Sequence, residues 1–254
     1  NVHPIADFGQ RISFAGVNNG DEAGYMVAAG EVFSTGSTDF VVSARRGDRT
    51  PADPNDDSGI VYVIDGTAVS PGPVIGLATM RSMIGAVPRG GLGESLAIGN
   101  FLTGVTGNEI AVTGVGTIPN DSTNPAGRLY VVSVPLSVLP GTPIDLMLGG
   151  STPMRRVRGD TNNDFFGFSL AALDLDPNTA ANGNELAVGT IYADRVGPPF
   201  QKNAGAVYLY RPIDLGNLAN PGNDPNVDQN AGTTARRIVW GQRLWDEFGF
   251  GLAS

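Results

Sequence analysis

The sequence has 254 residues and a formal net charge of −9, and its 36 Gly and 18 Pro together make up about a fifth of the chain. This share of helix-breaking residues excludes a long-helix or coiled-coil protein, while an apolar share of 41% is too high for a disordered chain. The acidic residues comprise 19 Asp and only 6 Glu. Because Asp favours turns and Glu favours helices, the composition predicts many short strands joined by turns.

The same composition excludes several classes of chemistry. The chain has no Cys, so it has no disulfide, no zinc–thiolate site and no thiol nucleophile. Its one His, His3, argues against Ser-His-Asp hydrolases and multi-histidine metal sites. Sixteen basic residues against 25 acidic ones argue against nucleic acid as a partner, since phosphate binding needs a net positive face. No apolar run approaches the roughly 18 residues of a membrane-spanning helix, so no membrane span is expected.

The strands predicted along the chain form a set that occurs three times. Each set begins with a Gly and a strand of small residues, continues with a strand opened by a carboxylate, and then has a Gly-x-hydrophobic-Tyr-hydrophobic strand. Short runs rich in β-branched and aromatic residues favour strands. The first set consists of residues 24–29, 39–43 and 59–64. The second consists of residues 93–98, 109–113 and 127–132, and the third of residues 167–172, 185–189 and 205–210.

A weaker fourth strand follows each set, at residues 80–87, 154–158 and 236–240. Residues 248–253 start a fourth set, and residues 8–12 resemble residues 240–244. The predicted units are therefore 17–90, 91–160 and 161–245. Residues 1–16 are expected to be the last strand of a preceding unit, and residues 246–254 the start of the next one.

The repeat period indicates the architecture. Successive first glycines, at positions 24, 93, 167 and 249, lie 69, 74 and 82 residues apart. Four antiparallel strands at a period near 75 are typical of β-propeller blades; small residues suit the innermost strand, where backbones converge. An ordinary β-sandwich is the alternative. We therefore predict an all-β fold, a β-propeller with four-stranded antiparallel blades, of which about three are present together with partial flanking strands.

Residues 166–171, 185–189 and 205–210 resemble the FG-GAP repeat, the blade unit of the integrin α-subunit propeller and of many bacterial secreted proteins. The pattern covers nearly the whole chain but is uneven. Phe-Gly is clear at positions 166–167 and 248–249 and degraded at positions 23–24 and 92–93, and the Gly-Ala-Pro element is absent. The resemblance implies a propeller fold and an extracellular or cell-surface location.

The resemblance also implies a calcium loop between the first and second strands, with the spacing Asp-x-Asp/Asn-x-Asp-Gly-x-x-Asp. Calcium takes six to eight oxygen ligands, which alternate residues of a tight loop supply. In the third unit the first, third, fifth and last ligand positions hold Asp174, Asp176, Asn178 and Glu185. The insertion at residues 179–184 departs from the family loop, and an Asx-rich turn is the alternative. Ca2+ is the one cofactor that we expect.

Three further Asp-x-Asn-x-Asp runs lie in loops and are weaker calcium candidates: Asp53, Asn55 and Asp57; Asp160, Asn162 and Asp164; and Asp224, Asn226 and Asp228. Alternating Asx residues are also common in solvated turns. The tripeptides at positions 46–48 and 158–160 read Arg-Gly-Asp, a sequence that some integrins bind. A three-residue match is weak evidence for such recognition.

Two functions fit these observations. The first is a non-catalytic extracellular interaction or structural module, such as an adhesion, cell-surface or filament component, with calcium-stabilised loops. Its partner would be a protein or glycan ligand at one propeller face, or other subunits of a surface assembly, because long loops on a rigid scaffold commonly carry binding. The alternative is an accessory propeller domain of a secreted polysaccharide- or lipid-acting enzyme. The residues single out no catalytic group.

Overall fold

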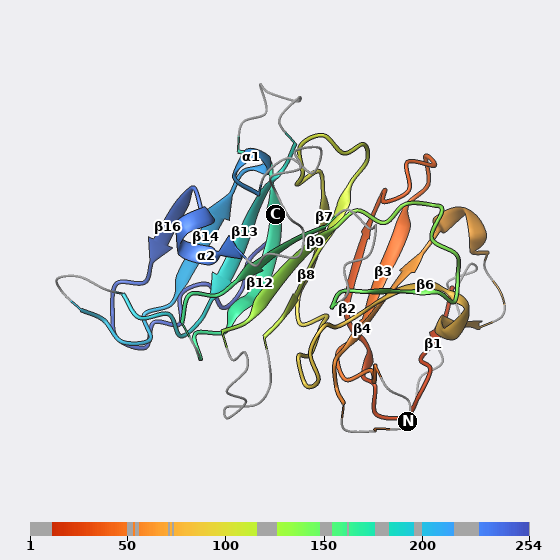
Figure 1. Ribbon diagram of the computed structural model, residues 1–254, viewed down its shortest axis with the longest axis horizontal. Coiled ribbons are helices and arrows are strands. Elements are labelled where there is room, and N and C mark those ends of the chain that lie inside the picture. The colour runs from red at the N-terminus through yellow and green to blue at the C-terminus, as the bar shows by residue number, and fades with distance from the viewer. Residues whose placement is uncertain are drawn as a thin grey trace.

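The structure is a computed structural model that describes residues 12–49, 53, 56–70, 72, 74–115, 126–147, 154–161, 163–175, 183–195, 200–215 and 229–253. Regular structure in these residues is mostly β-strand, with two short α-helices, α1 (Pro212–Leu215) and α2 (Ala231–Thr234), and two 3-10 turns, η1 (Gly66–Ala68) and η2 (Leu77–Thr79). The predicted all-β fold is confirmed. The strands form separate sheets that lie side by side along the molecule (Figure 1).

Three sheets share one antiparallel strand order, in which the strands are neighbours in the order of the sequence. The first contains β2 (Ala23–Gly30), β3 (Asp39–Ala44), β4 (Ile60–Ile64) and β6 (Arg81–Ile84). The second contains β7 (Leu96–Gly99), β8 (Glu109–Gly114), β9 (Arg128–Val132) and β11 (Met154–Arg158). The third contains β12 (Phe166–Leu173), β13 (Glu185–Thr190), β14 (Ala206–Tyr210) and β16 (Arg237–Trp240). The strands predicted for the three repeated sets are thereby confirmed.

The four strands of each set pair antiparallel, and a short parallel strand that the sequence analysis did not predict extends the outer edge of two of the sheets. β10 (Pro143–Asp145) pairs with β6, and β15 (Gln229–Asn230) pairs with β11. A third pair of the same kind joins β5 (Ile75–Gly76) to β1 (Phe14–Ala15). In all three pairs the added strand comes from the next unit along the chain. It lies just before that unit's fourth strand in the sequence. It satisfies N–H and C=O groups that the edge of a sheet would otherwise leave unpaired.

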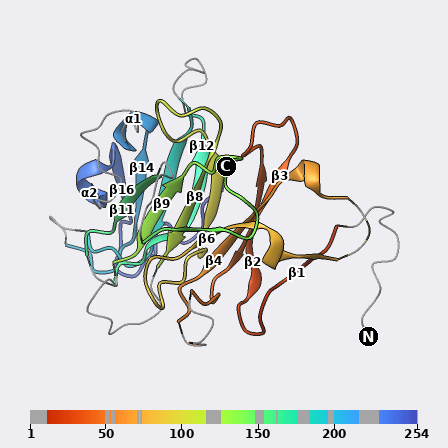
Figure 2. The same cartoon turned by 45° about the vertical axis from the view of Figure 1, so that its right-hand side comes forward.

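The core lies between adjacent sheets. Val41, Val61 and Met83 of the first sheet share one buried cluster with residues of the second sheet, such as Val112 and Tyr130. A second cluster joins the opposite face of the second sheet to the third. The first strands come closest together, since β7 contacts both β2 and β12. Figure 2 shows the second sheet, in yellow and green, between the first sheet, in red and orange, and the third, in cyan and blue. Alternating side chains of one strand therefore serve two interfaces.

The glycine that opens each Tyr-bearing strand allows two units to approach closely. Gly59, Gly127 and Gly205 have φ values of 84°, 82° and 75°. A Cβ at these positions would lie 2.2, 2.1 and 2.3 Å from a carbonyl oxygen of the next unit. The three oxygens belong to the residue directly before the first-strand glycine of the next unit. The backbone N–H of that same residue donates a hydrogen bond back to the preceding unit. Only glycine satisfies both the left-handed backbone and this contact.

Two predictions concern the ends of the repeat array. Phe248 forms an isolated bridge with Gly205, and residues 249–253 belong to no strand. That residues 246–254 start a further unit stays a prediction. The comparison of residues 8–12 with residues 240–244 falls almost entirely on residues outside the described part of the chain. Within that part, β1 and Gly16 stand in the fourth-strand position instead.

Candidate functional site

The loops between first and second strands are held by the carboxylate that opens each second strand. Asp39 Oδ2 accepts hydrogen bonds from the backbone N–H groups of Val32 at 2.7 Å and Phe33 at 2.9 Å. Glu109 Oε2 accepts from the two equivalent amides of the second loop at 2.7 and 2.9 Å. Both carboxylates are fully buried. The repeated carboxylate, which the sequence shows in all three units, thus has a structural role, because it replaces water as the acceptor for loop amides.

Glu185, the last predicted calcium ligand, takes part in the same arrangement. Its Oε2 accepts a hydrogen bond from Leu175 N at 2.9 Å. Asp174 lies in the described part of the chain, at the end of β12, whereas Asp176 and Asn178 lie outside it. Because Asp39 and Glu109 hold loops that have no alternating oxygens, the bond made by Glu185 is explained without a metal ion.

Asparagine side chains connect successive loops across the sheet boundaries. Asn184 N donates to Asn100 O at 2.6 Å, and Asn100 N donates to Asn184 Oδ1 at 2.9 Å. Asn108 Nδ2 donates to Glu31 O at 2.8 Å. Both Asn108 and Asn184 directly precede the carboxylate that opens a second strand. The three loops therefore form one connected row at the end of the sheets where β2, β7 and β12 finish.

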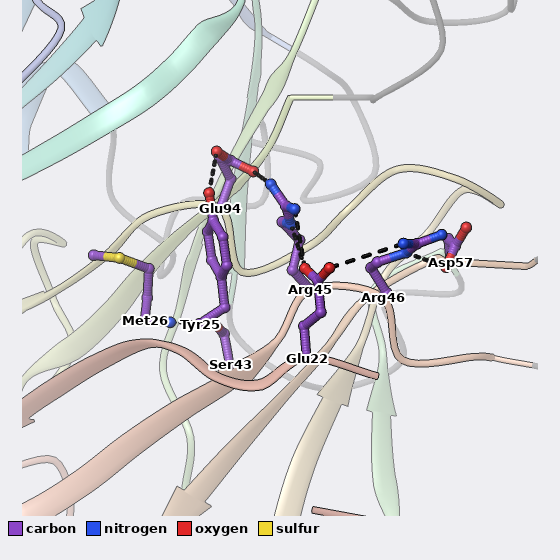
Figure 3. A network of polar contacts seen from close by, with 8 residues as sticks. All are labelled: Glu22, Tyr25, Met26, Ser43, Arg45, Arg46, Asp57 and Glu94. Atoms are coloured by element: carbon purple, nitrogen blue, oxygen red, sulfur yellow. Dashed lines mark hydrogen bonds and ion pairs between the residues drawn. The ribbon is translucent and has the colours of Figure 1, made fainter. Parts of the chain in front are cut away.

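The opposite end of the first two sheets carries a network of charged residues (Figure 3). The Arg45 guanidinium lies over the Tyr25 ring, 4.0 Å from its centroid, and donates to Glu22 Oε2 and to Glu94 Oε2 at 2.9 and 3.2 Å. The Tyr25 hydroxyl donates to Glu94 Oε1 at 2.9 Å. Glu94 directly follows the first-strand glycine of the second unit, as Tyr25 does in the first. The network therefore joins two units, and burial together with Glu94 raises the pKa of Tyr25.

Those of the other calcium candidates that the structure describes include two aspartates with hydrogen-bond partners in the protein. Asp57 Oδ1 accepts from Arg46 Nε at 3.2 Å, and Asp160 Oδ1 accepts from Gly232 N at 3.0 Å. Asn55, Asn162 and the run Asp224, Asn226 and Asp228 lie outside the described part of the chain. Among the described residues, no three acidic or His side chains are grouped in a way that would hold a metal ion.

Asp164 is distinguished by its environment. Burial raises its pKa to about 7, and the negative charge of Asp194 adds to the effect. Asp21 stands three residues before the first-strand glycine, as Asp164 does, and burial raises its pKa as well. The backbone carbonyl of Asp21 accepts a hydrogen bond from Arg46 N, and that of Asp164 accepts one from Tyr192 N, each at 3.1 Å. These carboxyls therefore belong to the repeated junction between units.

The Arg-Gly-Asp tripeptides are built into the fold. Asp48 Oδ1 accepts from Asp57 N at 3.1 Å, and Arg46 pairs with Asp57. Gly159 of the second tripeptide lies against Ala126 O, where a Cβ would be 2.1 Å from the oxygen. The two motifs thus have structural reasons for their residues.

Sequence reasoning missed the charged network and the asparagine contacts. The signal for both was the register of the repeat, since Glu94 aligns with Tyr25 and Asn108 aligns with Asn184.

No protein-family model and no curated protein matches the chain. In the described residues no helix is long and apolar enough to cross a membrane.

Proposed function

We propose that the chain is a length of β-propeller of the FG-GAP type and serves as a non-catalytic extracellular interaction or structural module. Three sheets with one strand order, joined by the same glycine junction and in contact through their first strands, support the propeller assignment. The small residues of β2, β7 and β12, such as Ala28, Ala97 and Ala171, suit strands that converge on an axis.

The observation that carries the binding role is the connected row of loops. Asn108 ties the second loop to residue 31 of the first, and Asn184 ties its own segment to residue 100 of the second. The described residues at these contacts therefore keep a fixed relation to one another. A binding surface on loops needs such pre-organisation, because ordering free loops on binding lowers the affinity. The partner is a protein or glycan ligand at this face, or another subunit of a surface assembly.

Binding is tested with a glycan array and a panel of immobilised extracellular-matrix proteins. We expect the wild-type chain to bind at least one probe, and Asn108→Ala to weaken that binding about tenfold, because one loop then loses its link to Glu31. Arg46→Ala removes an exposed ion pair at the opposite end and should leave binding unchanged. Equal loss in both variants, or no probe bound by the wild type, contradicts the proposal.

Calcium belongs to the same proposal, at the loop of Asp174, Asp176, Asn178 and Glu185, with Asp224, Asn226 and Asp228 as a weaker site. Such oxygen-rich loops of extracellular modules bind calcium with a Kd on the order of 10⁻⁴ to 10⁻³ M. Calorimetric titration with CaCl2 should give heat in the wild type, which Asp174→Ala abolishes. Glu31→Ala, the equivalent position of the first loop, should keep it. Absence of heat at millimolar calcium would contradict the proposed calcium binding.

A further inference from the structure

Three aromatic side chains, Phe165, Tyr192 and Trp245, are in contact at the end of the third sheet that lies opposite the asparagine contacts. The ring centroids of Phe165 and Tyr192 are 5.4 Å apart at an interplanar angle of 87°, and those of Tyr192 and Trp245 are 6.5 Å apart at 76°. Trp245 is 58% exposed, and the other two side chains are partly exposed. The three rings therefore form one aromatic surface on the loops that enter β12 and leave β13 and β16.

The first unit has an ion pair where the third has two of these rings. Tyr192 aligns with Arg46 and Phe165 with Glu22, in the register of the backbone hydrogen bonds that these loops share. Arg46 Nη1 lies 3.8 Å from Glu22 Oε1. Charged side chains are well solvated at a surface, whereas exposed rings are unfavourable in water. The exchange keeps the contact but adds apolar surface, which is typical of an interaction site.

The backbone of Trp245 makes this residue unexpected at its position. It stands four residues before a first-strand glycine, as Gly20, Arg89 and Asn163 do in the other units. All four residues have a left-handed backbone, with φ values of 64° for Trp245 and 96°, 58° and 68° for the others. Gly and Asn adopt this conformation readily, while a bulky ring there is costly. Such strained residues cluster at functional sites.

The internal units show the same exposure at this position. Arg89 and Asn163 are both exposed, although a complete sheet follows each of them. The backbone is also held alike, since Trp245 N donates to Lys202 O and Arg89 N donates to Asp56 O, at equivalent places in the repeat. A neighbouring unit therefore leaves this position open to solvent, and the exposed ring of Trp245 is a property of its own loop.

Carboxylates adjoin two of the rings. Asp164 directly precedes Phe165, and Asp246 directly follows Trp245. Two backbone N–H groups of its own loop donate to Asp246 Oδ2 and fix this carboxylate. Burial, and then the negative charge of Asp194, raises the pKa of Asp164. The carboxylates accept hydrogen bonds from hydroxyl groups, and their combined charge disfavours an anionic ligand.

We propose that the aromatic surface of Phe165, Tyr192 and Trp245 binds a neutral oligosaccharide. The C–H face of a sugar packs on an exposed aromatic ring, while its hydroxyl groups donate to the adjacent carboxylates. A protein partner would need about 800 Å² on each side. An aromatic side chain supplies about 150–250 Å² when fully buried by a partner, so three rings that are already partly buried fall short of that area. This surface goes beyond the function proposed above, because it lies at the opposite end from the asparagine contacts.

Calorimetric titration with cellohexaose and with N-acetylchitohexaose tests this inference. The wild type should bind at least one of the two sugars, and Trp245→Asn should weaken that binding about tenfold or more, because the most exposed ring is lost. Asn is the residue of the repeat at position 163 and suits the left-handed backbone, so the variant should unfold at the same or a higher temperature. Leu139→Asn, at another exposed apolar residue, should bind like the wild type.

Three outcomes would overturn the inference. They are a wild type that gives no heat with either sugar at millimolar concentration, a Trp245→Asn variant that binds as tightly as the wild type, and equal weakening by Leu139→Asn. Sugar binding that is lost in Asn108→Ala but kept in Trp245→Asn would place the sugar at the opposite end, which leaves the proposed function standing. Loss in Trp245→Asn alone supports the aromatic surface whatever the loop end binds.

Discussion

Replacing Gly127 by Ala should lower the free energy of unfolding by about 3 kcal/mol. The left-handed backbone, with φ of 82°, costs an Ala about 1–2 kcal/mol. The added Cβ would lie 2.1 Å from Phe166 O, and crowding in a packed region typically costs about 1–3 kcal/mol more. The obstacle is backbone of the next unit, so no side-chain rotation relieves it. Urea unfolding of the two proteins measures the difference.

Gly141→Ala is the matched control for this substitution. Gly141 has a similar φ of 78°, but a Cβ there would meet no atom within 4 Å. Its variant should therefore lose only the backbone part, about 1–2 kcal/mol. If the two variants were equally destabilised, the close approach of units at Gly127 would have no energetic weight.

Stability should fall as the pH rises from about 5 to 8, and Glu109→Gln should remove much of that slope. Burial raises the pKa of Glu109 from 4.5 to about 7, against the opposing hydrogen bonds from Phe101 N and Leu102 N. Glu109 Oε1 is buried with no hydrogen-bond partner in the structure. Since one pKa unit corresponds to about 1.36 kcal/mol, ionising this group in the folded state costs about 3 kcal/mol.

The sign follows from the raised pKa. The folded protein holds the Glu109 proton more tightly than the unfolded chain does, so this contribution is complete below the unfolded pKa and disappears as the pH passes about 7. Asp164, whose pKa is also raised to about 7, should leave a residual slope in the variant. Urea midpoints at pH 5 and pH 8 measure the effect. A variant with the slope of the wild type would show that Glu109 does not ionise in this range.

The strands were predictable because each has a local signature. The Gly-x-hydrophobic-Tyr pattern of residues 59–64 matches β4, and the carboxylate at Glu109 begins β8. Repetition strengthened each assignment, since three copies of one pattern rarely arise by chance. The role of the repeated carboxylate could not be derived, because its partners are backbone amides that every residue offers.

The parallel edge strands and the loop contacts could not be predicted for a different reason. β15 consists of Gln229 and Asn230, a two-residue strand whose pairing is set by its place beside β11 rather than by strand propensity. Asn184 faces Asn100, 84 residues away in the sequence, because adjacent sheets bring their loops together. The spacing of Asp174 and Glu185 favours calcium, but it could not predict that Glu185 accepts a hydrogen bond from Leu175 N.

Residue-resolved hydrogen exchange tests the central claim, that like units are joined by one repeated junction. The amides of Leu92, Phe166 and Phe248 donate to Ser58, Ala126 and Ala204 at 2.9, 3.3 and 3.1 Å, at equivalent places in the repeat. All three should exchange at least about a hundredfold more slowly than amides of exposed loops, and Gly127→Ala should accelerate Phe166 while sparing Leu92. Fast exchange at these amides, with the strand interiors still protected, would contradict the account.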